Sequence, residues 1–292
     1  MFRLVHFSDI HVTQPPTRGG WSGFVAEPKR WVGALNYALG GRRAHFRGVE
    51  ARIARLLEAV EAEAPDHALC TGDLTAMAYD AEMASARGLF AAASATAARY
   101  TVLPGNHDRY VTEREPRVFE RYFVDLADAG RGYPYAKRLA PRVSLVVLDV
   151  TRPTGLLDSS GRAGEAQLEQ LAALLAAPER ADDFVIVALH YALYRADGRR
   201  DRAGHGVRDD LALVEVLDRP SSRVDLVLHG HIHRPYQVRT AHRDVSCAGS
   251  ATDLHVREAG FDVYEIDPAG RRYTRARRVW DGARFVAQPP GL

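Results

Sequence analysis

The chain has 292 residues, of which 46% are apolar and 26% are charged, and its formal net charge is +2. This composition is typical of a globular protein with a sizeable core, and a charge this close to neutral does not favour a nucleic-acid partner. Two cysteines are too few for a disulfide framework, no apolar run approaches the ~20 residues that span a bilayer, and the N-terminus lacks the apolar core of a signal peptide. We therefore expect a soluble, cytoplasmic protein.

Over the first 230 residues, short apolar runs that predict strands alternate with amphipathic patterns that predict helices. Strands alternating with helices indicate an α/β layered fold. In chain order, the predicted elements are a strand at 2–7, a helix at 51–63, a strand at 67–71, a helix at 81–98, a strand at 100–103, a helix at 117–126, a strand at 143–149, a helix at 165–175, a strand at 184–189, a helix at 209–217 and a strand at 224–229.

After residue 234 the pattern changes to strands and turns only, with predicted strands at 236–239, 245–248, 261–266 and 271–279. We predict that these strands form a second, largely antiparallel sheet packed on the first, within one domain that spans residues 1–292.

Two long segments fit no simple connection between elements. Residues 13–48 contain Pro15-Pro16 and a helical stripe from Trp31 to Leu39, and residues 192–208 are rich in Arg and contain His205. Loops of this length in a compact domain are functional or disordered. We interpret 13–48 as an inserted segment, with its stripe either packed in the core or forming a peripheral membrane contact, and 192–208 as a candidate lid loop.

Polar residues with metal-ligand chemistry follow five of the predicted strands. Asp9 and His11 lie two residues apart, so both side chains project from the same side. His229, His231 and His233 share the same strand parity, so parity alone allows all three as metal ligands. Mixed nitrogen and oxygen ligation without thiolate suits two adjacent divalent ions, which would be Mn²⁺, Fe or Zn²⁺. The candidate ligands are Asp9, His11, Asp73, Asn106, His190, His231 and His233.

Two adjacent ions clamp a phosphate and make a bridging water hydroxide-like near neutral pH, so this set predicts phosphoester hydrolysis. The leaving alkoxide then needs a proton. His107 adjoins a candidate ligand, Asn106, and is our candidate acid. Asp108 either orients the His107 imidazole or makes a local turn hydrogen bond.

The order of these blocks resembles the calcineurin-like metallophosphoesterase superfamily, whose pattern is D-x-H, GD, GNH followed by D or E, a lone H, and G-H-x-H. The resemblance covers Asp9–His233 and implies a two-sheet β-sandwich flanked by helices, with the metals at the strand ends. It selects His231 and His233 over His229 and implies that His107 is the acid and Asp108 its partner. It assigns one metal to Asp9, His11, Asp73 and His233, and the other to Asp73, Asn106, His190 and His231.

Within that superfamily the chain most resembles the bacterial class III cyclic-nucleotide phosphodiesterases, through its GNHD block, a Gly-His-x-His-Arg-Pro stretch at 230–235, and Cys247-Ala-Gly-Ser-Ala. It departs at His190-Tyr191-Ala192, where that branch commonly has two histidines and then Pro, and residues 13–48 are longer than expected. The resemblance implies a phosphodiesterase acting on a small nucleotide-like phosphoester. One alternative is a pyrophosphatase acting on a nucleotide-lipid such as UDP-diacylglucosamine. The other is a non-catalytic scaffold, which would be expected to lose ligands that this chain keeps.

Overall fold

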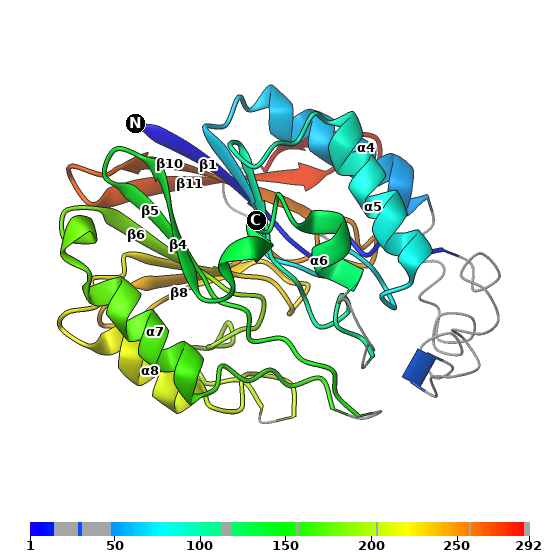
Figure 1. Ribbon diagram of the computed structural model, residues 1–292. Coiled ribbons are helices and arrows are strands. Elements are labelled where there is room, and N and C mark those ends of the chain that lie inside the picture. The colour runs from blue at the N-terminus through cyan, green and yellow to red at the C-terminus, as the bar shows by residue number, and fades with distance from the viewer. Residues whose placement is uncertain are drawn as a thin grey trace.

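The computed structural model describes residues 1–14, 29–30, 48–111, 118–155, 158–202, 204–256 and 258–288. Two six-stranded sheets pack face to face, and helices cover the outer face of each (Figure 1). This is the predicted two-sheet sandwich flanked by helices. Both cysteines are buried and free. None of the described helices is both long and apolar enough to cross a membrane.

The first sheet has the strand order β12-β11-β10-β1-β2-β3. β1, β2 and β3 run parallel, and β10 pairs with β1 in the antiparallel sense. The strand bounds are Phe2–Phe7 (β1), His67–Cys70 (β2), Tyr100–Val102 (β3), Gly260–Asp267 (β10), Arg272–Trp280 (β11) and Phe285–Ala287 (β12).

The second sheet has the strand order β4-β5-β6-β7-β9-β8, in which β5, β6, β7 and β9 run parallel. The strand bounds are Tyr135–Ala140 (β4), Val143–Val147 (β5), Phe184–Ala188 (β6), Leu226–His229 (β7), Tyr236–Arg239 (β8) and Asp244–Cys247 (β9).

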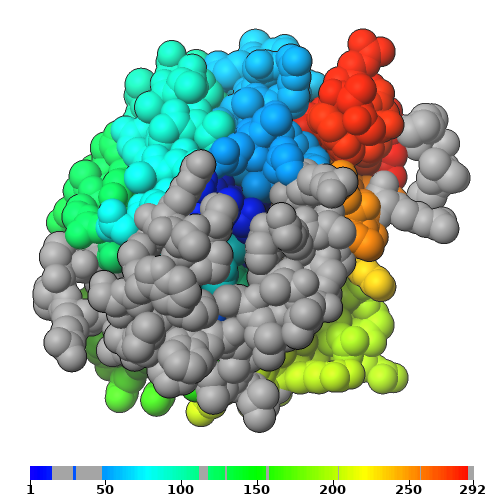
Figure 2. All heavy atoms as spheres, turned by 90° about the vertical axis from the view of Figure 1, so that its right-hand side faces the viewer, coloured from blue at the N-terminus to red at the C-terminus, as the bar shows by residue number. Residues whose placement is uncertain are grey.

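Helices α4 (Val49–Ala62), α5 (Asp80–Ala92) and α6 (Val118–Phe123) cover the first sheet, and α7 (Glu165–Ala176) and α8 (Asp210–Asp218) cover the second. Short 3-10 helices lie at Ala129–Arg131 and Pro178–Arg180. Figure 2 shows α4, in blue, between the cyan residues of α5 and the red residues of the C-terminal strands.

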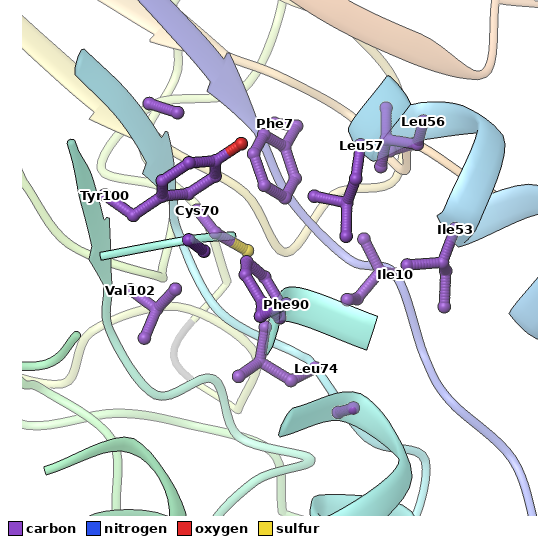
Figure 3. Close-up of a cluster of buried hydrophobic side chains, with 14 of the residues drawn as sticks. Phe7, Ile10, Ile53, Leu56, Leu57, Cys70, Leu74, Phe90, Tyr100 and Val102 are labelled. Atoms are coloured by element: carbon purple, nitrogen blue, oxygen red, sulfur yellow. The ribbon is translucent and has the colours of Figure 1, made fainter. Parts of the chain in front are cut away.

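Three apolar clusters hold the layers together. Leu4, Leu228 and Tyr264 belong to the cluster between the two sheets. Phe7 of β1 has the opposite parity to Leu4 and packs with Ile53 of α4 and Phe90 of α5 (Figure 3). Period-two alternation along β1 therefore supplies both the inter-sheet core and the core beneath the helices. A third cluster joins the second sheet to α7 and α8.

The predicted second sheet made only of late strands is wrong. β10, β11 and β12 extend the first sheet beside β1, whereas β8 and β9 extend the second sheet beside β7. The three parallel strands β1–β3 and the three parallel strands β5–β7 each leave exposed edges, and the late strands pair with one edge of each set. An apolar alternation specifies a strand, but it does not specify that strand's partner.

One predicted helix differs from the structure in its bounds, two strands were missed, and one predicted segment cannot be compared. The helix predicted at 81–98 ends at Ala92, because Ser94 adopts a left-handed conformation (φ 55°) and the Ala95 N–H bonds back to Phe90 O. β4 and β12 were not predicted. The inserted segment 13–48, with its Trp31–Leu39 stripe, lies almost wholly outside the described residues.

Candidate metal centre

The site forms where the carboxyl ends of the parallel strands of both sheets meet. Asp9, Asp73 and Asn106 follow β1, β2 and β3 of the first sheet, and His190 and His231 follow β6 and β7 of the second. Backbone hydrogen bonds connect these loops within and between sheets. The Asp9 N–H donates to Gly72 O at 2.9 Å, and the Ala251 N–H donates to Ser8 O at 2.9 Å.

One group of predicted ligands comprises Asp9, His11, Asp73 and His233, whose ligand atoms lie within 4.8 Å of one another. The Nε2 atoms of His11 and His233 are 3.0 Å apart. His11 Nε2 is 3.7 Å from Asp73 Oδ2, and His233 Nε2 is 3.4 Å from Asp9 Oδ1. Two imidazoles and two carboxylates therefore point at one small volume.

A second group is centred on Asn106. Its Oδ1 is 3.0 Å from His190 Nε2 and 2.9 Å from His231 Nδ1. His190 Nε2 is also 3.5 Å from Asp73 Oδ2. One carboxylate oxygen of Asp73 thus lies near both groups, so the seven predicted ligands form two adjoining clusters that share Asp73.

The backbone places these side chains at a conformational cost. Non-glycine residues with positive φ are uncommon, and each such strained position costs roughly 1–3 kcal/mol. Five of the seven predicted ligands are of this kind, a concentration that is typical of functional sites. The values are φ 54° at Asp9, 45° at His11, 56° at Asp73, 71° at His231 and 59° at His233.

Two glycines permit the close approach of these loops. A Cβ at Gly105 would lie 2.1 Å from Asp73 Oδ1, and a Cβ at Gly230 would lie 1.9 Å from Ser8 Oγ and 2.4 Å from Asp9 Oδ2. Any larger residue at either position would displace a carboxylate of the site. The glycines of the GNHD and G-H-x-H blocks are therefore required sterically.

Each of the four imidazoles is also held through its other ring nitrogen, which orients the ring and selects its tautomer. His11 Nδ1 lies 3.2 Å from Thr75 O, and His190 Nδ1 donates to Thr71 O at 2.7 Å. His231 Nε2 lies 3.0 Å from His205 O, and His233 Nδ1 lies 3.3 Å from Asp253 Oδ2. His231 thus presents Nδ1 to the centre, whereas the other three present Nε2.

Neighbouring charged groups shift the pKa values of the buried predicted ligands. Burial opposes the charged form of Asp73, but His190, His107 and His11 hold its pKa well below the usual range. Burial likewise lowers the pKa of His190 and His233, but the carboxylates raise these pKa values to about 9 and about 10, respectively. Asp73 and Asp9 act on His190, and Asp253 and Asp9 act on His233.

The donor set fits a pair of divalent ions. Asp9 Oδ1 is buried and accepts no hydrogen bond of good geometry within the described ranges, and His233 Nε2 lies 3.4 Å from it. A buried carboxylate oxygen without a donor is costly unless a cation neutralises it. Mixed imidazole, carboxylate and amide donors without thiolate match the preferences of first-row divalent ions.

His107 lies against the first group. Its ring packs edge-on against His11, with centroids 4.9 Å apart, and stacks on Tyr110 at 5.5 Å. Its Nδ1 donates to Ala76 O at 2.6 Å, and its backbone N–H donates to Asp73 Oδ1 at 2.8 Å. Because Nδ1 donates to Ala76 O, the proton of the neutral ring lies on Nδ1.

Asp108 is buried beneath the same loops. Its carboxylate accepts hydrogen bonds from the backbone N–H groups of Gly105, Leu74 and Thr75 at 2.9–3.0 Å, and from the Thr75 hydroxyl at 2.9 Å. Burial, with Asp73 nearby, raises the pKa of Asp108 to about 6. This geometry favours the local hydrogen-bonding role, because Asp108 ties the Asp73 and Asn106 loops together.

His229, which strand parity alone admits as a ligand, lies in the core. Its Nδ1 is 2.9 Å from Gly230 O and its ring packs on Tyr236, and burial lowers its pKa to about 4. The structure therefore places His229 in the core, whereas strand parity alone does not distinguish it from His231.

Asp253 was not predicted from the sequence, and His205 had no defined role in that prediction. The His205 ring is 4.2 Å from the His231 ring, and its Nδ1 is 2.7 Å from Asp201 Oδ2. The candidate lid loop 192–208 therefore contacts the metal centre through the backbone and ring of His205. A carboxylate in the loop after β9 could have been considered as an orienting partner for a histidine ligand, but no spacing pattern identifies Asp253.

The fold and the site together define a dinuclear metallophosphoesterase. The model of the calcineurin-like phosphoesterase family matches residues 2–235, and the chain belongs to this family. A comparison with curated proteins gave no significant match.

Solved structures share the fold. A dimetal phosphatase from Danio rerio has a TM-score of 0.64 and 13% identity, over 98% of each chain. Purple acid phosphatase PPD1 from yellow lupin has a TM-score of 0.58 and 14% identity, over 98% of this chain and 52% of that one. GAP50, described as the anchor in the inner membrane complex of Plasmodium, has a TM-score of 0.50 and 12% identity, over 100% of this chain and 86% of that one. At these identities the likeness shows the fold alone.

Proposed function

We propose that this metal-dependent phosphohydrolase is a phosphodiesterase that cleaves a small nucleotide-like phosphoester. One divalent ion would be held by Asp9, His11, Asp73 and His233, and the other by Asp73, Asn106, His190 and His231. The observation that carries the proposal is the position of Asp73 Oδ2, which is 3.7 Å from His11 Nε2 and 3.5 Å from His190 Nε2. A carboxylate between two ligand groups is the arrangement that a paired metal centre needs.

When bound, two such ions neutralise phosphate charge and supply hydroxide near neutral pH. The remaining requirement is a proton for the leaving alkoxide. We assign it to His107, because Ala76 O fixes its Nδ1 and leaves Nε2 directed away from that contact. Asp108 acts as a positioning residue that holds the two loops carrying Asp73, Asn106 and His107.

The space beside the centre supports an ester with an organic substituent. A cavity of about 1030 Å³ borders His233, in the upper range for small-molecule sites. Ala196, from the loop 192–208, forms part of its wall. We propose that residues 1–292 act as one domain in which this loop borders the active site as a lid.

The alternatives are less well supported. The nucleotide-lipid pyrophosphatase depended on the stripe at 31–39, which lies outside the described residues. A non-catalytic scaffold does not require the left-handed backbone that positions five of the predicted ligands in the two groups.

Metal reconstitution tests the proposal. Mn²⁺ added to chelator-stripped protein is expected to restore cleavage of bis-p-nitrophenyl phosphate in preference to p-nitrophenyl phosphate, with cyclic AMP as a third substrate that decides the branch. Asp73→Asn should lower the rate at least about 10³-fold, because it removes the charge shared by both ligand groups. Asp182→Asn, an exposed change beside the opposite end of β6, is the matched control. Wild-type activity in Asp73→Asn would exclude the shared-carboxylate mechanism.

A further inference from the structure

A second cavity lies at the end of the sandwich opposite the metal centre. It has a volume of about 760 Å³, within the range of small-molecule sites. Phe184 and Asp244, which line it, are the first residues of β6 and β9, whereas the predicted ligand His190 follows the last residue of β6. The run from Phe184 to His190 spans roughly 20 Å at about 3.3 Å per residue, so this cavity is remote from the metal centre.

The lining of this cavity is cationic. Five arginines and two aspartates line it, an excess of three positive charges, although the whole chain has a formal net charge of only +2. A concave surface with an excess of one charge raises the local concentration of ions of the opposite sign. The arginines come from β8 and the turn after it, in the second sheet, and from the start of β11 and the turn before it, in the first sheet: Arg239, Arg243, Arg271, Arg272 and Arg275.

The two aspartates of the lining are each compensated by one arginine. Asp244 accepts from both Nε and Nη2 of Arg239 at 2.8 Å, and Asp225 accepts from Arg271 Nη2 at 2.7 Å. The surface that a ligand contacts therefore keeps the excess of positive charge. The carboxylates that pair with the other three arginines do not line the cavity, and they are Asp218, Asp267 and Asp262.

The two most exposed arginines of the lining keep N–H donors for a ligand. A guanidinium has five N–H donors. Arg272 donates only through Nε, to Asp267 Oδ2 at 3.0 Å, and Arg239 donates through Nε and Nη2. Their side chains are 79% and 82% exposed, and among the described residues Nη1 of each has no hydrogen-bond partner. Guanidinium groups with free N–H donors bind phosphate oxygens bidentately.

We propose that this cavity binds a small molecule that carries two or more linked phosphate groups. A single phosphate group carries a charge of about −2 at most, which is less than the excess on the lining, whereas linked phosphates match that excess. Linked phosphates also reach both exposed arginines, Arg239 on the second sheet and Arg272 on the first. This binding site is separate from the metal centre, and the proposal does not rest on the proposed function.

Calorimetric titration of the full-length protein with tripolyphosphate tests the proposal, with orthophosphate as the comparison that carries one phosphate. Metal is removed first, because tripolyphosphate binds Mn²⁺, and 0.15 M NaCl screens weak surface attraction. The wild type is expected to bind one tripolyphosphate per chain, at least about tenfold more tightly than orthophosphate, because each further charged hydrogen bond contributes about 1.5–3 kcal/mol.

Three variants complete the test. Arg239→Gln/Arg272→Gln, which removes both exposed guanidinium groups, should weaken tripolyphosphate binding at least about tenfold. Ala241→Glu should also weaken it, because this change adds a carboxylate to the lining, in the turn between β8 and β9, without removing a side-chain contact. Arg55→Gln, which removes an exposed arginine of α4 that pairs with Glu58, is the matched control and should bind as the wild type does.

Absence of tripolyphosphate binding, or equal wild-type affinity for the two ligands, would overturn the proposal. Binding that is unchanged in Arg239→Gln/Arg272→Gln or in Ala241→Glu would place the anion elsewhere and would overturn it as well. All three variants should hydrolyse bis-p-nitrophenyl phosphate with Mn²⁺ at the rate of the wild type. Failure of the wild type to hydrolyse that ester would instead count against the proposed function.

Discussion

His233 Nδ1 lies 3.3 Å from the Oδ2 atom of Asp253, in the loop after β9, while His233 Nε2 faces Asp9 at the metal centre. The same loop is anchored to the site by Ser250, whose hydroxyl donates to Asp9 O at 2.7 Å and accepts from the Asp253 N–H at 3.1 Å. Asp253 therefore orients one predicted ligand from a part of the chain that lies beyond every sequence block of the site.

We expect Asp253→Asn to weaken Mn²⁺ binding about 10–100-fold, the range typical of changes to the partner of a histidine ligand. The amide keeps the volume but loses the charge that favours the bound orientation of His233. Competitive titration against a metal indicator measures the effect, with Asp182→Asn as the charge-matched control. Unchanged Mn²⁺ affinity in Asp253→Asn would show that His233 is oriented by other contacts.

The role of His107 as acid predicts a dependence on the leaving group. His107→Ala should slow hydrolysis of an alkyl ester about 10²–10⁴-fold, the usual contribution of a positioned acid, because an alkoxide needs a proton to leave. p-Nitrophenolate leaves without a proton, so nitrophenyl esters should be affected far less. The measurement is kcat of the wild type and of His107→Ala on an alkyl ester and on a nitrophenyl ester. An equal loss on both would assign His107 a structural role.

A methyl group at Gly230 should damage metal loading more than folding. In Gly230→Ala the new Cβ would lie 1.9 Å from Ser8 Oγ and 2.4 Å from Asp9 Oδ2, so Asp9 must move. We expect less than one Mn²⁺ per chain by elemental analysis after gel filtration. Gly88→Ala, at a helical position with nothing within 4 Å of its Cβ, is the matched control and should load normally. Full loading of Gly230→Ala would contradict the steric argument.

Metal binding should depend on pH in a defined direction. In the metal-free protein, carboxylates raise the pKa of His190 to about 9 and that of His233 to about 10, against burial that lowers both. The protonated imidazoles stabilise the metal-free fold fully below the unfolded pKa of ~6.5, and this contribution is lost as pH rises through the folded values. Metal binding requires the neutral rings, so Mn²⁺ competes with fewer protons as pH rises.

Between pH 6.5 and 8.5, the increase in Tm on adding Mn²⁺ should therefore grow, and Mn²⁺ binding should release protons. Thermal unfolding with and without Mn²⁺ measures the first effect. Calorimetry in two buffers of different ionisation enthalpy measures the second. A Tm increase that shrinks with pH would contradict the predicted ionisation of His190 and His233.

Sequence patterns predicted the elements better than their arrangement. β1, β6 and the helix Glu165–Ala176 lie within a residue or two of their predicted bounds, because apolar periodicity reports which residues are buried locally. The same periodicity did not identify the partners of β10 or β8, and it missed β4, most of whose residues are only partly buried. Strand pairing depends on contacts between distant segments, which local patterns do not contain.

For the site, the class of chemistry could be predicted from the sequence alone. Five blocks ending in carboxylate, amide and imidazole groups, each following a predicted strand, predicted a phosphoesterase with a paired metal centre, because these donors without thiolate suit two divalent ions. Three further features became visible in the folded chain. Asp73 lies near both ligand groups, and Asp108 accepts backbone hydrogen bonds. Asp253 and His205 contact the outer ring nitrogens of His233 and His231, respectively. Those roles depend on which loops of the two sheets are adjacent. Packing between the two sheets determines which loops these are, and local sequence patterns do not contain that information.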